Sequence, residues 1–132
     1  MAEQIMLGPV HHVALRVTDL GRSITFYTDL FGFQPIAELP DVTILSNGAV
    51  LLGLRDQGHA ERADRFDEFR VGLDHLSFAV GGREDLDRAL QMLDQRDVPH
   101  GEIEDLGKDF GMYVLAFRDP DNIQLEFFAP PG

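Results

Sequence analysis

Two segments of the chain, residues 12–17 and 75–80, alternate apolar and polar residues as a half-buried strand does. Each is followed by an amphipathic segment with apolar residues at helical spacing. The first predicted helix starts after Asp19, a suitable cap, and stops at Gly32. The second starts near residues 82–84. The apolar stripes of the two helices are Leu20, Ile24, Tyr27 and Phe31, and Leu86, Ala89, Leu90 and Leu93.

After each helix the pattern returns to period two. The expected strands are residues 33–39, 42–46 and 49–54 in the first half, and 101–105, 113–118 and 123–129 in the second. Turn residues separate the last two strands of each half, Asn47-Gly48 in one and Asp119-Pro120-Asp121-Asn122 in the other. The sequence therefore predicts an α+β fold in which a βαβββ module occurs twice.

These elements predict a single domain over residues 8–130. Its parts are module one (8–54), a connector (55–72) and module two (73–130). The connector is rich in Asp, Glu, Arg and His, including His59, Glu61 and Arg62. Such a run predicts a solvated linker, with a charged lid over a substrate as the alternative.

The composition narrows the class of protein. The 132 residues carry 11 Lys plus Arg against 23 Asp plus Glu, a net charge of −12, which disfavours nucleic acid and anionic membranes as partners. The absence of cysteine excludes disulfides and thiolate chemistry and favours a cytoplasmic location. The sequence has no apolar run near the ~18 residues of a membrane span, and no signal peptide is expected.

Strand alternation places both histidines at the strand starts on one face. His12 and His75 lie opposite the apolar residues of their segments, and the apolar face is expected to hold the helix. Glu126 alternates with Leu125 and Phe127 and is expected on the same face as the histidines. This face is therefore the candidate ligand-binding surface.

Two neutral imidazoles and one carboxylate form the facial triad that suits Fe(II), Mn(II) or similar ions. His12 and His75 occupy the same place in the two halves, so a pairing of the halves would bring both to one centre. The repeat therefore predicts a divalent metal site with Glu126 as third ligand. Pairing of Glu126 with a surface arginine is the alternative.

Four motifs resemble the vicinal oxygen chelate superfamily, which includes glyoxalase I, extradiol dioxygenases, methylmalonyl-CoA epimerase, fosfomycin-resistance enzymes and bleomycin-resistance proteins. The motifs are His12 with Asp19-Leu20, Ser23-Ile-Thr-Phe26-Tyr27 leading to Leu30-Phe31-Gly32-Phe33, Asp74-His75-Leu-Ser-Phe-Ala-Val80, and Phe117-Arg-Asp119-Pro120-Asp121-Asn122-Ile-Gln-Leu-Glu126.

This resemblance implies the glyoxalase/bleomycin resistance/dihydroxybiphenyl dioxygenase fold, in which two modules form a cupped, open eight-stranded mixed sheet. It also implies a homodimer and a small-molecule substrate chelated through neighbouring oxygens. His12, His75 and Glu126 match three family ligand positions. Fe(II) or Mn(II) is the favoured ion, with Zn(II) or Ni(II) as alternatives.

The chain departs from the family pattern at a fourth position. Superposing Asn47-Gly48 on Asp121-Asn122 puts Leu52 where glyoxalase I has a second Glu, and leucine neither ligates a metal nor takes a proton. The remaining ligand set is similar to those of the extradiol dioxygenases and the fosfomycin-modifying enzymes. Ala14 stands where fosfomycin-modifying enzymes tend to carry Thr, so that branch is less favoured. A lyase or isomerase of the glyoxalase I type and a non-catalytic binding protein of the bleomycin-resistance type are the alternatives.

Further candidates have weaker signals. His100 and Tyr113 are the candidate catalytic acid or base groups at the edge of the cup, although each also suits a structural role. Arg16 and Arg118 are candidates for holding an anionic substrate. His11 alternates away from His12 and is expected at the surface.

Overall fold

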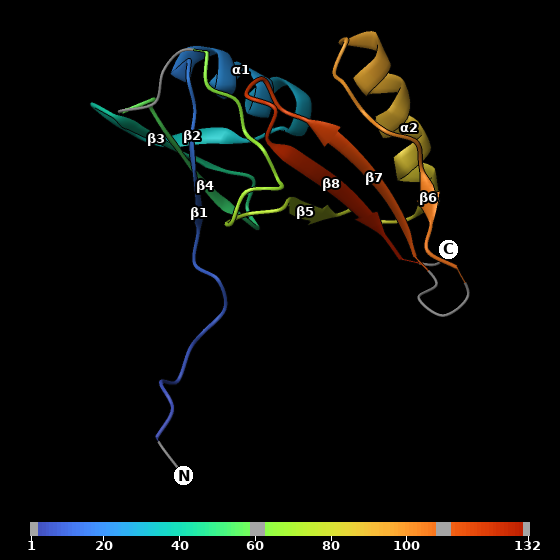
Figure 1. The fold of residues 1–132 in the computed structure, drawn as a ribbon, viewed down its shortest axis with the longest axis horizontal. Coiled ribbons are helices and arrows are strands. Elements are labelled where there is room, and N and C mark those ends of the chain that lie inside the picture. The colour runs from blue at the N-terminus through green and yellow to red at the C-terminus, as the bar shows by residue number, and fades with distance from the viewer. Residues whose placement is uncertain (1–2, 59–62, 108–111, 131–132) are drawn as a thin grey trace. The chain divides into compact units, whose positions relative to one another are not determined.

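The computed structural model describes residues 3–58, 63–107 and 112–130. The chain divides into two compact units, Met1–Arg62 and Ala63–Gly132. Each unit holds one four-stranded mixed sheet and one helix (Figure 1). The predicted α+β class and the repeated βαβββ module are therefore confirmed. His59, Glu61 and Arg62 of the predicted connector lie outside the described residues, among which no helix is long and apolar enough to cross a membrane.

The sheet of the first unit has the strand order β1-β4-β3-β2. Strands β1 and β4 are parallel, whereas β3 pairs antiparallel with both β4 and β2. The elements in chain order are β1 (Val13–Arg16), α1 (Leu20–Phe31), β2 (Gln34–Leu39), β3 (Val42–Ser46) and β4 (Leu51–Arg55).

Helix α1 begins and ends where the sequence predicts. Asp19 accepts a hydrogen bond from the Arg22 N–H at 3.1 Å, which satisfies one of the unpaired donors of the first turn. Gly32 ends the helix with φ 73°, a left-handed conformation that glycine adopts without a steric penalty, and its N–H donates to the Thr28 carbonyl. Two local signals therefore fix the bounds of this helix.

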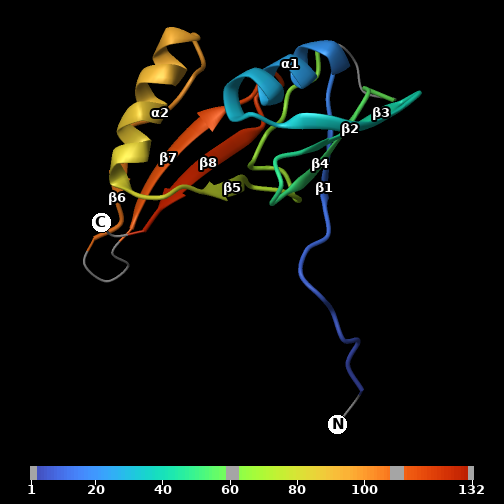
Figure 2. The same ribbon diagram turned by 180° about the vertical axis from the view of Figure 1, so that it is seen from behind.

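The second unit repeats the arrangement with the strand order β5-β8-β7-β6. Helix α2 lies along β7 and β8 (Figure 2). The elements in chain order are β5 (Leu76–Ala79), α2 (Arg83–Gln95), β6 (Glu104–Asp105), β7 (Tyr113–Arg118) and β8 (Gln124–Ala129). Strands β5 and β8 are parallel, as β1 and β4 are in the first unit.

The core of each unit lies between the sheet and its helix. Side chains of alternate strand positions and of the inward helix face are almost completely buried, and the main ones are Leu15, Val17, Tyr27, Leu52 and Leu54 in the first unit and Leu86, Leu93, Leu115, Phe117 and Leu125 in the second. Burying each such side chain contributes about 1.5–3 kcal/mol. The face of each sheet away from its helix carries the remaining strand side chains, which alternate with those of the core.

The predicted strand at residues 101–105 is much shorter in the structure. Regular pairing with β7 is limited to Glu104–Asp105, and His100 makes an isolated bridge to Phe117. Gly101 donates its N–H to the Ala116 carbonyl at 2.8 Å, so the segment still runs along β7. The prediction was wrong in extent because one glycine and three acidic residues among residues 101–105 form weak strand sequence at an edge.

Residues 66–68 of the connector are held by the second sheet and are not fully solvated. The guanidinium of Arg118 donates to both carboxylate oxygens of Glu68, at 2.9 and 2.6 Å. The Phe66 N–H donates to the Asp121 carbonyl at 2.9 Å, and the Asn122 amide donates to the Phe66 carbonyl at 3.0 Å. The hydrogen bonds from Arg118 lower the pKa of Glu68 to about 2. Residues 66–68 therefore belong to the second unit.

Candidate metal centre

The face of the second sheet away from α2 carries the predicted ligands of this unit. Strand register pairs Ser77 of β5 with Glu126 of β8, so their side chains share a face, while Leu76 and Leu125 pair on the helix side. His75 precedes β5 by one position and falls on the Ser77 face by alternation. The predicted faces of His75 and Glu126 are those that the strand register supports.

His75 and Glu126 approach each other closely. Nε2 of His75 lies 3.8 Å from Oε2 of Glu126, beyond hydrogen-bond distance. The side chain of Glu126 is 18% exposed and that of His75 is 40% exposed. Two atoms of the kind that bind divalent ions therefore face each other without a direct hydrogen bond.

The second polar atom of each of these side chains is already engaged. Ser77 Oγ donates to Glu126 Oε1 at 2.9 Å. His75 Nδ1 lies 2.7 Å from Asp74 Oδ1, and Gln124 Nε2 donates to the same carboxylate oxygen at 3.1 Å. These contacts direct Nε2 and Oε2 toward the shared space, which is the arrangement expected of metal-ligating side chains.

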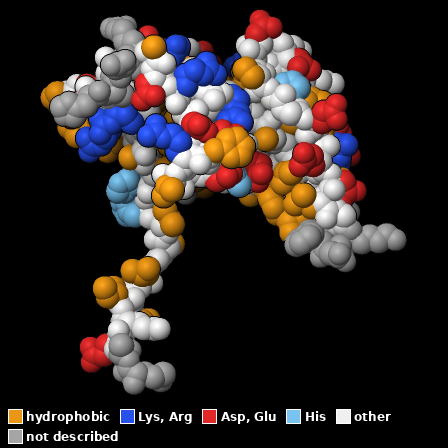
Figure 3. Space-filling view, in the orientation of Figure 1, with side chains coloured by type: hydrophobic (Ala, Val, Ile, Leu, Met, Phe, Trp, Pro, Cys, Tyr) orange, Lys and Arg blue, Asp and Glu red, His pale blue; other side chains and the backbone are white. Residues whose placement is uncertain are grey.

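His12 belongs to the first unit, where it precedes β1 as His75 precedes β5. It is exposed, and its Nδ1 lies 2.9 Å from Nδ1 of His11. Pale-blue histidine side chains stand at the surface where the N-terminal segment joins the first sheet (Figure 3). Within the described ranges, no three His, Asp or Glu side chains form a metal-binding group.

The structure corrects the position of Leu52. Its side chain is completely buried, and Leu52 pairs with Val13 on the helix face as Leu125 pairs with Leu76. The residue that pairs with Ala14, as Glu126 pairs with Ser77, is Gly53.

The sequence superposition was one residue out of step because the two hairpins differ in length. Residues 47–50 connect β3 to β4, whereas residues 119–123 connect β7 to β8, one residue more. A fourth protein ligand is still lacking at the equivalent position, because glycine has no side chain. The residue responsible is Gly53 and not Leu52.

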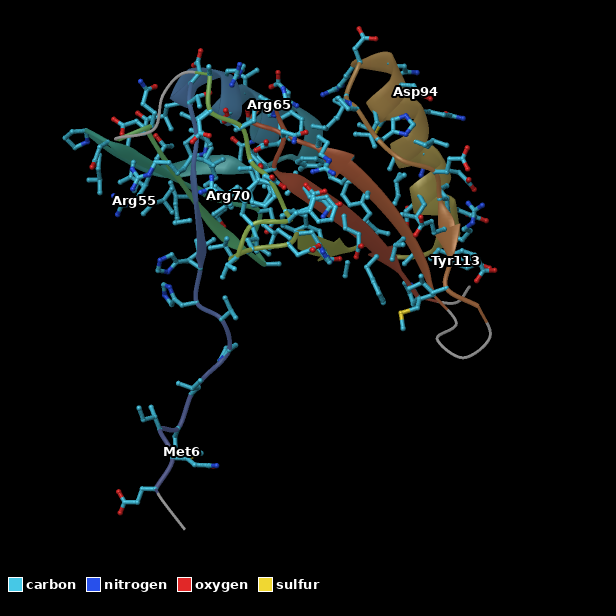
Figure 4. The ribbon with its side chains drawn as sticks, viewed as in Figure 1. Met6, Arg55, Arg65, Arg70, Asp94 and Tyr113 are labelled. Atoms are coloured by element: carbon cyan, nitrogen blue, oxygen red, sulfur yellow. The ribbon has the colours of Figure 1, made fainter. Side chains whose placement is uncertain are left out.

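His100 and Tyr113 lie on the helix face of the second sheet. Tyr113 pairs with Ala129 on that face, and the Arg83 guanidinium of α2 lies 5.2 Å from the centre of its ring. His100 bridges to the buried Phe117. Figure 4 shows Asp94 on α2 and Tyr113 at the start of β7. The unit therefore does not bring either candidate acid or base to the face of Glu126.

The ring of His100 is held between two acceptors. Nε2 lies 2.5 Å from Asp94 Oδ1, and Nδ1 lies 2.6 Å from the Gly101 carbonyl oxygen. A carboxylate and a carbonyl both require a donor, so the contacts favour the doubly protonated ring. The hydrogen bond to Asp94 accordingly raises the pKa of His100. His100 and Asp94 therefore have the geometry of an ion pair that stabilises the fold.

The two candidate arginines also have partners. Arg16 donates to the Asp56 carbonyl at 2.9 Å and lies 4.0 Å from the Asp56 carboxylate. Arg118 is on the face of Glu126, where it holds Glu68. Neutralisation by Glu68 leaves Arg118 less able to attract an anion.

Comparisons with known proteins identify the family. Residues 10–127 match the model of the Glyoxalase/Bleomycin resistance protein/Dioxygenase superfamily, so the chain belongs to this family. It is 31% identical to the Bacillus subtilis (strain 168) protein YwkD over 94% of this chain and 98% of that protein. It is 25% identical to metallothiol transferase FosB of Staphylococcus saprophyticus, over 92% of this chain and 76% of FosB.

Solved structures share the fold. A glyoxylase/bleomycin resistance protein/dioxygenase domain from Frankia sp. EAN1pec is 34% identical, with a TM-score of 0.81 over 95% of this chain and 99% of that one. Fosfomycin resistance protein FosX of Listeria monocytogenes, in complex with Mn(II), is 17% identical, with a TM-score of 0.76 over 95% and 92% of the two chains. The resemblance predicted from the sequence motifs is confirmed.

Proposed function

We propose that this chain is a metal-dependent enzyme that acts on a small molecule bound through two neighbouring oxygens. His12, His75 and Glu126 are the proposed protein ligands. The observation that carries the proposal is the 3.8 Å approach of His75 Nε2 to Glu126 Oε2, with Asp74 and Ser77 engaging the other atom of each side chain. The name of the relative FosB, metallothiol transferase, and the Mn(II) complex of FosX support a divalent ion.

A divalent ion held by two imidazoles and a carboxylate supplies Lewis-acid polarisation of the chelated oxygens. The residues of the chain hold and shape the site. Ser77 fixes Glu126, and Phe128 provides half-buried apolar surface on the same face for the carbon skeleton of a substrate. Since Gly53 adds no ligand, three protein ligands leave open positions for substrate oxygens and a further small molecule.

Two reaction classes compete within this proposal. The three-ligand set favours Fe(II)- or Mn(II)-dependent oxygenation of a vicinal diol such as a catechol. The similarity to metallothiol transferase FosB favours transfer of a thiol, and the name of FosX, a fosfomycin resistance protein, makes fosfomycin an acceptor to test. A non-catalytic binding protein is the alternative from another class. As His100 and Tyr113 lie on the helix face, the proposal assigns neither of them a catalytic role.

The first test is metal binding by the purified protein after chelation and dialysis. We expect about one Mn(II) or Fe(II) per chain, and loss of stoichiometric binding in His12→Ala, His75→Ala and Glu126→Ala. Asp64→Asn is the matched control, because Asp64 is an exposed carboxylate whose oxygen accepts from its neighbour's N–H. Unchanged metal content in His75→Ala contradicts the proposal.

The second test identifies the reaction. The loaded protein is assayed for oxygen uptake with catechols, for thiol consumption with fosfomycin, and for isomerisation of the methylglyoxal–glutathione adduct. Oxygen uptake supports the first class and thiol consumption the second. Robust isomerisation contradicts the inference drawn from Gly53. Binding of metal without any of these activities favours the binding-protein alternative.

A further inference from the structure

Each candidate ligand histidine is contacted at Nδ1 by the residue immediately before it. Asp74 Oδ1 lies 2.7 Å from His75 Nδ1, and His11 Nδ1 lies 2.9 Å from His12 Nδ1. The two pairs occupy the same position in the two units, directly before β1 and β5. In both units the histidine before the first strand therefore has a partner at Nδ1, although Asp74 and His11 differ chemically.

The contact at His75 determines which nitrogen carries the proton. An ionised carboxylate accepts hydrogen bonds and donates none, so His75 Nδ1 must be the donor to Asp74. The neutral ring then has its lone pair on Nε2, the atom that lies 3.8 Å from Glu126 Oε2. Metal ions bind the unprotonated nitrogen, so Asp74 prepares His75 for ligation.

Asp74 is itself held in place, although its side chain is 69% exposed. The side-chain amide of Gln124 donates to the Asp74 carbonyl at 3.0 Å and to its carboxylate at 3.1 Å. Gln124 is on β8, two positions before Glu126 and on the same face. The strand that supplies one ligand thus also fixes the partner of the other.

The contact at His12 has a similar Nδ1 distance, with a second imidazole in place of the carboxylate. Of two Nδ1 atoms 2.9 Å apart, one donates and the other accepts. When His12 donates, its Nε2 is unprotonated and able to bind a metal. The rings of His11 and His12 are nearly perpendicular, at 87°, with centroids 5.1 Å apart. His11, expected from the sequence at the surface, is exposed and also restrains His12.

We infer that Asp74 and His11 are positioning residues, which hold His75 and His12 in the Nδ1–H tautomer with Nε2 directed to the metal. The inference rests on the proposed function for the role of Nε2. The tautomers themselves are properties of the metal-free protein. The tautomers and the metal-binding role of Nε2 can therefore be tested separately.

The tautomer test uses long-range proton–nitrogen NMR correlation on metal-free protein in alkaline buffer, where imidazoles are neutral. His75→Gln and His12→Gln assign the two rings among the five histidines. We expect Nδ1–H to dominate for His75, and Asp74→Leu to shift that ring toward Nε2–H. Asp74→Glu should retain part of the Nδ1–H signal. An unchanged His75 tautomer in Asp74→Leu overturns the inference.

The affinity test uses titration with Mn(II) alone. We expect Asp74→Asn to weaken binding about 10–100-fold, the usual effect of removing the partner of a ligating histidine. His11→Ala should weaken binding by a smaller factor, because a neutral ring is a poorer acceptor than a carboxylate. Asp64→Asn, with the same change of charge in the same unit, should bind as the unaltered protein does.

The outcomes separate the two proposals. If the unaltered protein binds no Mn(II), Fe(II), Ni(II) or Zn(II), the proposed function fails, and the tautomer test alone decides the positioning role. If the unaltered protein binds metal and Asp74→Asn binds equally well with an unchanged unfolding midpoint, the positioning role fails and the proposed function stands. Equal weakening by Asp74→Asn and Asp64→Asn also overturns it, since the cause would be net charge.

Discussion

Leu52 and Gly53 are adjacent residues on opposite faces of the first sheet. Leu52 is completely buried against the helix face. A Cβ added to Gly53 would lie 3.5 Å from the Ala14 Cβ, an ordinary van der Waals distance. Gly53 is also buried, but it lies on the face of His12 and has room for a Cβ.

We predict that Leu52→Glu destabilises the protein by more than about 3 kcal/mol, because it buries an unpaired carboxylate. Gly53→Ala should change stability by less than about 1 kcal/mol, because its Cβ meets only ordinary van der Waals contacts, and Leu52→Met, a volume-conserving control, by less than about 1.5 kcal/mol. Urea unfolding followed by circular dichroism measures all three. A stable Leu52→Glu beside an unfolded Gly53→Ala would contradict the register of β1 and β4.

At the scale of elements, two ion pairs hold loop segments of the second unit in place. His100 and Asp94 connect the end of α2 to the segment before β6, and Arg118 connects β7 to Glu68 of the connector. The first pair raises the pKa of His100, whereas the second lowers that of Glu68 to about 2. The two contacts therefore respond to pH in opposite directions.

For His100, protonation and folding are coupled favourably because its pKa is raised above the ordinary value of 6.5. The stabilisation is complete below pH 6.5 and is lost as pH rises through the folded pKa. We predict that Asp94→Asn lowers stability by about 1 kcal/mol or less at about pH 5.5, with a smaller effect at about pH 9. Denaturant unfolding at several pH values measures this, with Asp87→Asn on α2 as control.

For Glu68 the sign is reversed, because its pKa falls from 4.5 to about 2 in the folded chain. The stabilisation is present above pH 4.5 and is lost as pH falls through about 2. We predict that Glu68→Gln lowers the unfolding midpoint at neutral pH and that the difference shrinks toward pH 2. Asp67→Asn, at an exposed neighbour, should have little effect. An equal loss at both pH values would contradict the assignment.

At the scale of the whole molecule, exposed apolar residues and open sheet edges favour association. In the N-terminal segment Ile5, Met6, Leu7 and Val10 are each more than 80% exposed, and hydrophobic side chains line this segment in Figure 3. Met6 is labelled there in Figure 4. Strands β1 and β5 lie at the edges of their respective sheets. Unpaired edges of this kind are commonly covered in an oligomer.

We predict a homodimer, the state that the family resemblance implies, at micromolar concentration in sedimentation velocity. Leu7→Glu should increase dissociation because it adds a charge to the exposed apolar segment. Met92→Glu, which places the same charge on the outer face of α2, should leave the dimer intact. A strictly monomeric protein would contradict the prediction, and equal effects of both variants would argue against the N-terminal segment as the contact.

Local elements and the two faces of each sheet follow from short-range signals in the sequence. The cap at Asp19, the left-handed glycine at residue 32 and strand alternation act over a few residues, so the bounds of α1 and the faces of His75 and Glu126 could be read from the chain. The repeat and its motifs also sufficed to identify the family.

Pairing between distant segments is a property of the tertiary structure instead. The longer β7–β8 loop, in which Asp119 Oδ1 accepts from the Asp121 and Ile123 N–H groups, shifts the register by one residue relative to the first unit and puts Gly53 opposite Ala14. Likewise, hydrogen bonds across 50 residues place Gln124 on Asp74. Sequence patterns specify which face a residue occupies, but the strand register and side-chain geometry set its partner.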